Sequence, residues 1–306
     1  MTRIRLLVAV VTTLVLLAAC HAVPVPPAPP IKRVTLNGAE ISYVEHGTGE
    51  TVILLHGVGT DLRIWEDVQP YLGRGFRFVA YSRRHHAPNA WPDDGRTHRL
   101  ATHVEDLAAF IRALSVDKAH IVGVSLGGRV AAEMVLAHPE LVASAIINDS
   151  LVGAPESAEA QAVLQAFFRP FAALDQAVKA GNAPDAAVAL VDWLYQSPGA
   201  WNAMPEHRKA YYRDNAQTLA PALRNDAATR RPTCEAIGQV RLPVMVMDGT
   251  ETPRAFRITN DALFACLPGG AERAHIPRAG HFWYVDNPRG GAEVILRFLD
   301  SHALHR

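Results

Sequence analysis

Apolar and polar positions follow two different patterns along the chain. Continuous apolar runs rich in β-branched residues, typical of buried parallel strands, alternate with stretches whose apolar residues recur at helical spacing. The strand-like runs are residues 51–57, 76–82, 119–125, 142–149 and 242–249, with a further predicted strand at 271–277. The helical stretches are residues 103–116, 127–140 and 291–304. Before them, residues 33–47 predict a hairpin around the turn signal Asn37-Gly38. This order predicts an α/β fold, a doubly wound, mostly parallel sheet with helices on both faces.

One long interval breaks the alternation of strands and helices. Residues 151–238 contain no buried-strand run, but they contain helical stretches and several aromatic residues. A helical insertion between two strands is the simplest account, so we expect a core of residues 32–150 and 239–306 with a helical cap at residues 151–238. The cap aromatics could line a pocket or form the core of the cap, and helical spacing does not separate the two. They are Trp193, Tyr195, Trp201, Tyr211 and Tyr212.

The first residues have the pattern of an export signal. Arg3 and Arg5 precede an apolar run that ends in small residues and Cys20. The ending "LAAC" resembles the lipobox of bacterial lipoproteins, which implies a signal peptide at residues 1–19 and a lipid-bearing Cys20. A plain secretory signal or an uncleaved anchor is the alternative. The proline-rich residues 20–31 then form a tether. The expected location is the cell envelope, outside the cytoplasm and lipid-anchored to a membrane.

Charge and metal-ligand spacing narrow the classes of function. Lys+Arg and Asp+Glu number 30 each, so no basic excess indicates a nucleic-acid partner. The 14 histidines form no zinc motif, and we interpret them as scattered surface or loop residues rather than metal ligands. Cys234 and Cys266 could pair in an exported protein or remain as two buried thiols.

The strongest chemical motif is a G-x-S-x-G turn. Gly123, Ser125 and Gly127 lie between a predicted strand and a predicted helix, which is the context that this motif requires. A sharp strand-to-helix turn forces the serine into a strained conformation and exposes its hydroxyl beside a helix N-terminus. The alternative is an ordinary glycine-rich turn without chemistry.

With this motif, the chain resembles the α/β-hydrolase fold family from about residue 32 to residue 299. "LLHGVG" is similar to the family's HG turn, and "GHFWYVDNP" is similar to its late histidine element. The resemblance implies that His281 is the catalytic base and that the backbone N–H groups of Val58 and Leu126 form the oxyanion hole. His56, in the HG turn, is expected to shape that loop. The segment "YSRRHHAPNAWP" stands in place of the family's D-x-R-G-x-G-x-S loop but lacks its glycines, so we expect another loop shape.

The third member of a Ser-His-acid triad is harder to place. Family members usually keep it in a G-x-x-D turn after the penultimate strand, where this chain has Thr252. Some members carry it one strand earlier, which points to Asp149, and we favour this residue. Glu251 and Asp248 are the alternatives. Asp149 could also merely cap the first turn of the insertion.

These features predict a serine hydrolase that acts on a carboxylic ester or a related small-molecule acyl substrate, without a cofactor. In the family that the chain resembles, haloalkane dehalogenases and epoxide hydrolases use Asp as the nucleophile. The serine at this position therefore argues against these two activities. The rival hypothesis is a non-catalytic envelope lipoprotein that uses the fold as a binding module.

Overall fold

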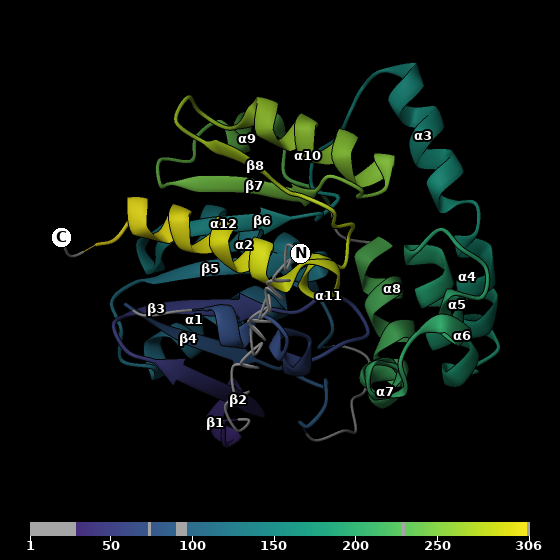
Figure 1. Ribbon diagram of the computed structural model, residues 1–306, viewed down its shortest axis with the longest axis horizontal. Coiled ribbons are helices and arrows are strands. Elements are labelled where there is room, and N and C mark those ends of the chain that lie inside the picture. Colours follow the sequence, from purple (N-terminus) through teal and green to yellow (C-terminus); the bar gives the residue numbers. More distant parts are fainter. Residues whose placement is uncertain (1–28, 73–74, 90–96, 228–229, 305–306) are drawn as a thin grey trace, which may run out of the picture.

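The computed structural model describes residues 29–72, 75–89, 97–227 and 230–304 (Figure 1). The predicted signal peptide, Cys20 and most of the predicted tether lie outside these ranges. Within them, every helix is too short or too polar to cross a bilayer.

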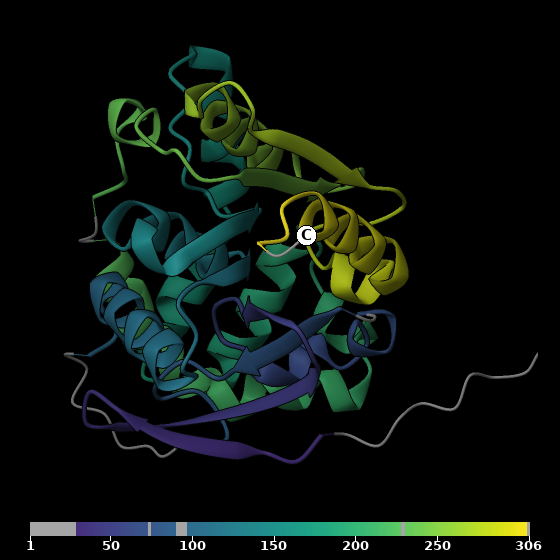
Figure 2. The ribbon, with the colours of Figure 1, turned by 90° about the vertical axis from the view of Figure 1, so that its left-hand side faces the viewer.

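An eight-stranded sheet forms the centre of the molecule. Its spatial order is β1-β2-β4-β3-β5-β6-β7-β8. The β1–β2 hairpin pairs antiparallel with β4, and all pairings from β4 to β8 are parallel. Figure 2 shows the hairpin at one end of the twisted sheet and β7 and β8 at the other. The strands are β1 (Lys32–Leu36), β2 (Ala39–Gly47), β3 (Glu50–Leu55), β4 (Phe76–Tyr81), β5 (Ala119–Val124), β6 (Val142–Asn148), β7 (Val244–Gly249) and β8 (Glu272–Ile276).

Burial explains why the central strands read as continuous apolar runs. Every residue of β5, β6 and β7 is buried, because helices cover both faces of the sheet. In the hairpin, Asn37 and Gly38 have φ values of 46° and 75°, the left-handed pair that a tight two-residue turn needs. The prediction of a doubly wound, mostly parallel sheet is confirmed.

Two hydrophobic clusters lie on opposite faces of the sheet. The side chains of Ile53 and Leu55 belong to the cluster that includes α1 and α2, whereas Val52 and Leu54 belong to the cluster that includes α12. The helices and 3₁₀ turns of the core are η1 (Leu62–Trp65), η2 (Gln69–Tyr71), α1 (Leu100–Ala113), α2 (Leu126–Ala137), η3 (Pro139–Leu141), α10 (Arg254–Cys266), α11 (Trp283–Asp286) and α12 (Pro288–Ser301).

Helix α10 was absent from the sequence prediction. Its buried positions include Thr259 and Asn260 beside Phe256 and Leu263. These polar residues interrupt the apolar stripe by which an amphipathic helix is recognised. The helix is nevertheless central to the site, as described below.

The chain between β6 and β7 is helical, and we call this segment the cap (Figure 1, teal to green helices). Its elements are α3 (Ala158–Phe168), α4 (Phe171–Lys179), α5 (Ala183–Leu194), α6 (Ala200–Ala203), α7 (Glu206–Asn215), η4 (Ala216–Thr218), α8 (Leu219–Ala227) and α9 (Cys234–Ile237). Helix α7 is fastened to the core by polar contacts. Asn215 donates to the buried carboxylate of Asp61 at 2.7 Å and accepts from the backbone of Ala87 at 2.7 Å.

A disulfide bond joins the end of the cap to the core. Cys234 in α9 is bonded to Cys266 at the end of α10, with an S–S distance of 2.02 Å. The sequence left open whether these residues pair or remain buried thiols, and the structure shows the pair.

Removing this bond is expected to destabilise the protein. The two cysteines are 32 residues apart. Closing a loop of that length is worth about 3–4 kcal/mol in the chain-entropy model, so the double variant Cys234→Ser/Cys266→Ser should lose most of that free energy of unfolding. Urea unfolding measures the difference. Reductant should destabilise the wild type and leave the double variant unchanged. Equal unfolding curves for the wild type and the double variant without reductant would contradict the prediction.

Candidate active site

Ser125 lies at the sharp turn between β5 and α2. Its backbone has φ 55° and ψ −121°, a region that non-glycine residues rarely occupy. The turn is too tight for side chains on its flanks. A Cβ at Gly123 would lie 2.3 Å from the carbonyl oxygen of Gly127, and one at Gly127 would lie 2.4 Å from that of Leu55. The two glycines of the motif are therefore required by close backbone contacts.

His281 and Asp149 form a buried pair at the same edge of the sheet. His281 lies in the loop after β8, Asp149 follows β6, and their Nδ1 and Oδ2 atoms are 3.1 Å apart. Only 3% of His281 and none of Asp149 is exposed. The ring of Phe256 stacks on the imidazole, with centroids 4.2 Å apart and planes 6° apart. The orientation of His281 is thus fixed by a carboxylate on one side and an aromatic face on the other.

Two neighbouring side chains hold the Asp149 carboxylate in place. Thr252 donates its hydroxyl to Oδ2 at 2.6 Å, and the amide of Asn260 donates to Oδ1 at 2.8 Å. Thr252 occupies the position where the G-x-x-D pattern has its acid. Here it provides a hydrogen bond to the acid that contacts His281.

Among the described residues, neither alternative acid forms a hydrogen bond with His281. Asp248 is buried at the end of β7, but its carboxylate is held by Arg273 at 2.5 Å and by His275 at 2.5 Å. Glu251 is exposed. Asp149 also does not cap the first helix of the insertion, since α3 begins at Ala158 and is capped by Ser157.

The two expected oxyanion donors flank the nucleophile. Leu126 is the first residue of α2, so its N–H has no acceptor within the helix. Val58 follows the HG turn, where a Cβ on Gly57 would lie 3.3 Å from Ser125 Cβ. Both ring nitrogens of His56 are engaged, with Gly57 O at 2.9 Å and the N–H of Arg83 at 3.0 Å. His56 therefore belongs to the structure of this loop.

A cavity of about 680 Å³ contains the nucleophile and extends under the cap. Ser125, Asp149, Val58 and Leu126 line its core side. The remaining walls come largely from the cap, with Phe256 from α10. They combine apolar side chains, among them Phe168, Phe171, Trp193, Leu194 and Leu223, with the charged side chains of Arg129, Asp175, Lys179, Arg224 and Arg231. Of the five cap aromatics singled out in the sequence, only Trp193 lines this cavity. Tyr195, Tyr211 and Tyr212 line a separate, smaller pocket.

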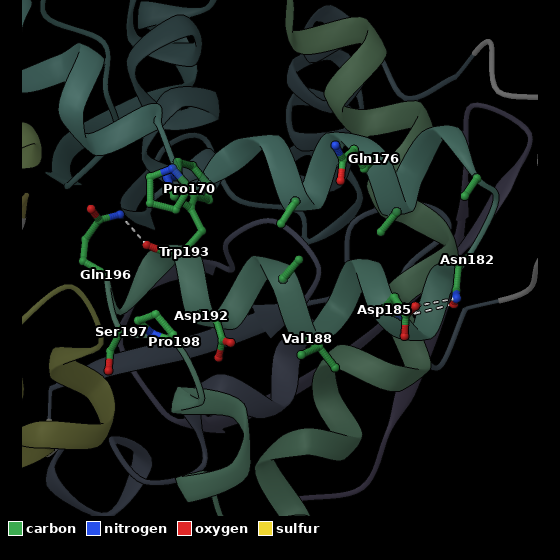
Figure 3. A pocket seen from close by; sticks show the side chains of 14 residues that line it. Pro170, Gln176, Asn182, Asp185, Val188, Asp192, Trp193, Gln196, Ser197 and Pro198 are labelled. Atoms are coloured by element: carbon green, nitrogen blue, oxygen red, sulfur yellow. Dashed lines mark hydrogen bonds between the residues drawn. The ribbon is translucent and has the colours of Figure 1, made fainter.

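A second hollow of about 660 Å³ lies between α4 and α5 (Figure 3). It contains none of the candidate catalytic residues. Two polar side chains around it bond within the cap: Asn182 donates to Asp185 at 2.7 Å, and Gln196 donates to the backbone of Trp193 at 2.6 Å. The cavity at Ser125 is thus the better candidate for chemistry.

The histidine prediction was wrong in part. Among the described residues six histidines are buried: His56, His86, His98 and His281 in loops, His103 in α1 and His120 in β5. Burial holds the pKa of His56, His86 and His103 well below the usual value, so these rings are neutral at neutral pH. Among the described residues, no group of three or more His, Cys, Asp or Glu side chains is arranged to hold a metal ion.

The loop after β4 contains a non-glycine residue in a left-handed conformation. His85 stands at the first glycine of the family pattern, counted from Arg84, and has φ 66°. This conformation costs backbone energy that a glycine would avoid.

Sequence reasoning missed two residues of the site. Phe256 and Asn260 both lie on α10, and both contact the His281–Asp149 pair. Their spacing of four residues places them on one helix face, which was the only available signal.

In the described residues, no hydrogen bond joins the Ser125 hydroxyl to His281. The structure brings together the His281–Asp149 pair, and it places Ser125, Asp149 and both oxyanion candidates around one cavity. Catalytic hydrogen bonds are often long in unliganded enzymes and tighten with substrate.

The chain is similar to several hydrolases of known sequence or structure. The chain is 27% identical over 275 residues to the 2-hydroxy-6-oxo-6-(2'-aminophenyl)hexa-2,4-dienoic acid hydrolase of Metapseudomonas resinovorans, covering 88% of this chain and 91% of the relative. Solved structures with the same fold include a bacterial membrane phospholipase A, with a TM-score of 0.72 and 22% identity over 90% of this chain and 87% of the other. A thermophilic esterase from Thermogutta terrifontis has a TM-score of 0.70 and 18% identity over 90% and 100% of the two chains.

The family model described as "alpha/beta hydrolase fold" matches residues 50–288, which span the sheet from β3 onwards, the cap and the candidate site. The chain therefore belongs to the alpha/beta hydrolase fold family.

Proposed function

We propose that the protein is a serine hydrolase that cleaves carboxylic esters or related acyl substrates. The observation that carries this proposal is the buried His281–Asp149 pair beside a cavity that Ser125 lines at a nucleophile turn. Each part has a role in acyl transfer, and the apolar side chains in the cavity walls suit an acyl group.

The His281–Asp149 pair transfers protons in this mechanism. Asp149 accepts the Nδ1–H of His281, which leaves Nε2 as the basic nitrogen. As Ser125 Oγ attacks the acyl carbon, Nε2 takes the hydroxyl proton, and Asp149 stabilises the imidazolium. The proton then passes to the leaving alkoxide, so that an alcohol departs and an acyl group remains on Ser125.

Charge on the tetrahedral intermediate is stabilised by main-chain donors. The N–H groups of Val58 and Leu126 bind the oxyanion, and the N-terminus of α2 adds its partial positive charge. In the second half-reaction a water gives its proton to His281 and attacks the acyl carbon. Ser125 recovers the proton, and the product is a carboxylic acid.

The site of action is part of the proposal. The signal pattern and Cys20 suggest an exported, lipid-anchored protein of the cell envelope, and the disulfide supports an oxidising compartment. The fold shared with a membrane phospholipase A and an esterase is compatible with ester substrates at a membrane surface.

A series of p-nitrophenyl esters from acetate to decanoate tests the proposed activity. Each methylene that enters the apolar cavity gains about 0.8 kcal/mol of transfer free energy, so kcat/KM should rise about fourfold per methylene until the cavity is filled. Initial rates of p-nitrophenolate release measure this. A folded protein that turns over none of the esters would support the rival hypothesis of a non-catalytic binding module.

A further inference from the structure

Among the described residues, Arg83 is a buried cation without an acidic partner. It lies just after β4 and is 1% exposed, and its Nε and Nη1 atoms make no hydrogen bond in the described structure. Burial lowers the pKa of Arg83 to about 10, so the guanidinium is still charged at neutral pH. The ionisable rings around it, those of His56, His86 and His103, are neutral because burial lowers their pKa values.

The next residue shows how an arginine in this loop is ordinarily accommodated. Arg84 is also buried, but it forms a two-pronged ion pair with Asp106, with N–O distances of 2.5 and 2.6 Å. A buried charge is costly unless it is paired. A structural role is therefore sufficient to explain Arg84, whereas the unpaired charge of Arg83 calls for another explanation.

The short hydrogen bond of the Arg83 guanidinium goes to one carbonyl group, and a longer contact of 3.5 Å joins the same Nη2 atom to His56 Nδ1. Arg83 Nη2 donates to Gly57 O at 2.7 Å. The same oxygen is 2.9 Å from His56 Nδ1 and accepts from the Thr60 hydroxyl at 3.3 Å. His56 Nε2 accepts the backbone N–H of Arg83 at 3.0 Å, so Nδ1 carries the ring proton and is a donor to Gly57 O. Three donors thus converge on the Gly57 carbonyl.

The Gly57 carbonyl belongs to the same rigid unit as the Val58 N–H. The peptide bond between them is planar and trans, so fixing the C=O also fixes the N–H, which points in the opposite direction. Gly57 is directly against the nucleophile, since an added Cβ would lie 3.3 Å from Ser125 Cβ. The positively charged guanidinium that donates to the carbonyl oxygen also polarises the peptide group, and this strengthens the Val58 N–H as a donor.

We propose that Arg83 is a positioning residue of the oxyanion hole: through the Gly57 carbonyl it orients and polarises the Val58 N–H. This inference rests on the proposed hydrolase function. An oxyanion forms only after attack on the acyl carbon, so the effect of Arg83 falls on transition-state stabilisation rather than on binding of the ground-state ester.

Arg83→Met tests the inference, because methionine fills similar space without charge or donor. Loss of one direct oxyanion donor costs about 10²- to 10³-fold in kcat, and loss of its support should cost about 10- to 100-fold. The KM for p-nitrophenyl butyrate should change little. Affinity for butylboronic acid, whose serine adduct places an oxygen in the oxyanion hole, should fall by the same factor as kcat/KM.

Two conservative variants separate charge from geometry. Arg83→Lys keeps the charge and should recover most of the boronate affinity, whereas Arg83→Gln keeps only a neutral donor and should recover less. These two variants decide the question even if Arg83→Met does not fold. Equal boronate affinity in the Lys and Gln variants and the wild type would overturn the inference.

Arg84→Met is the matched control. It breaks the Asp106 pair, so it should lower the free energy of unfolding while kcat/KM and boronate affinity stay within about threefold of wild type. If it reduces boronate affinity as much as Arg83→Met does, the role of Arg83 is merely structural. A wild type that hydrolyses no ester would instead refute the proposed function on which this inference rests.

Discussion

Replacing Asp149 by asparagine is expected to lower kcat about 10³- to 10⁴-fold while the protein stays folded. Asparagine has nearly the same shape, but it can present an amide N–H to His281 Nδ1. The histidine would then carry its proton on Nε2 and lose the free nitrogen that removes the proton of Ser125. The charge that stabilises the imidazolium is lost as well. Steady-state rates on p-nitrophenyl butyrate, with circular dichroism and thermal unfolding of the same samples, measure both effects.

The two alternative acids provide the controls. Glu251 is exposed, and among the described residues its carboxylate forms no hydrogen bond with the imidazole, so Glu251→Gln should keep kcat within about twofold. Asp248→Asn should mainly lower stability, because the buried carboxylate is paired with Arg273 and His275. An active Asp149→Asn protein together with an inactive Glu251→Gln protein would overturn the assignment of Asp149.

The displaced acid has a simple physical basis. Parallel strands end at one edge of the sheet, so the loops after β6 and β7 are neighbours, and a carboxylate on either can approach a histidine in the loop after β8. Asp149 adopts φ 43°, a left-handed conformation that aspartate tolerates better than most residues. Thr252, on the other loop, supports it by a hydrogen bond.

Much of the fold was predictable because its signals are local. The runs that became β3 to β7 are apolar since both faces of the sheet are covered, and the serine turn is identified by its glycines and its strand–helix context. The contact between Asp149 and His281 was predicted only by resemblance. These residues are 132 positions apart, and nothing in a single sequence measures that approach.

The remaining features depend on tertiary packing. Helix α10 hides polar residues on its inner face because Asn260 binds Asp149 there, which breaks the periodic pattern. The buried histidines escaped prediction because a neutral imidazole can be buried like other ring side chains once its pKa is lowered. The pairing of Cys234 with Cys266 depends on a Cα–Cα distance of 5.0 Å that spacing along the chain does not reveal.

Ser125→Ala is expected to have the largest effect of all single substitutions, a loss of at least about 10⁴-fold in kcat. Without Oγ there is no acyl-enzyme, and only the oxyanion hole and substrate binding remain to accelerate attack by water. The change removes a single atom from a cavity-facing side chain, so stability should stay near that of the wild type. Burst kinetics on p-nitrophenyl acetate should show an acylation phase in the wild type and none in the variant.

Reaction with a fluorophosphonate tests the central claim most directly, because the reagent forms a phosphorus–oxygen bond only with an activated serine and releases fluoride. We predict one adduct per folded molecule by intact-protein mass spectrometry, on the peptide that contains Ser125, and none in Ser125→Ala. A folded wild-type protein that remains unlabelled, or a Ser125→Ala variant that is labelled as readily as the wild type, would contradict the account.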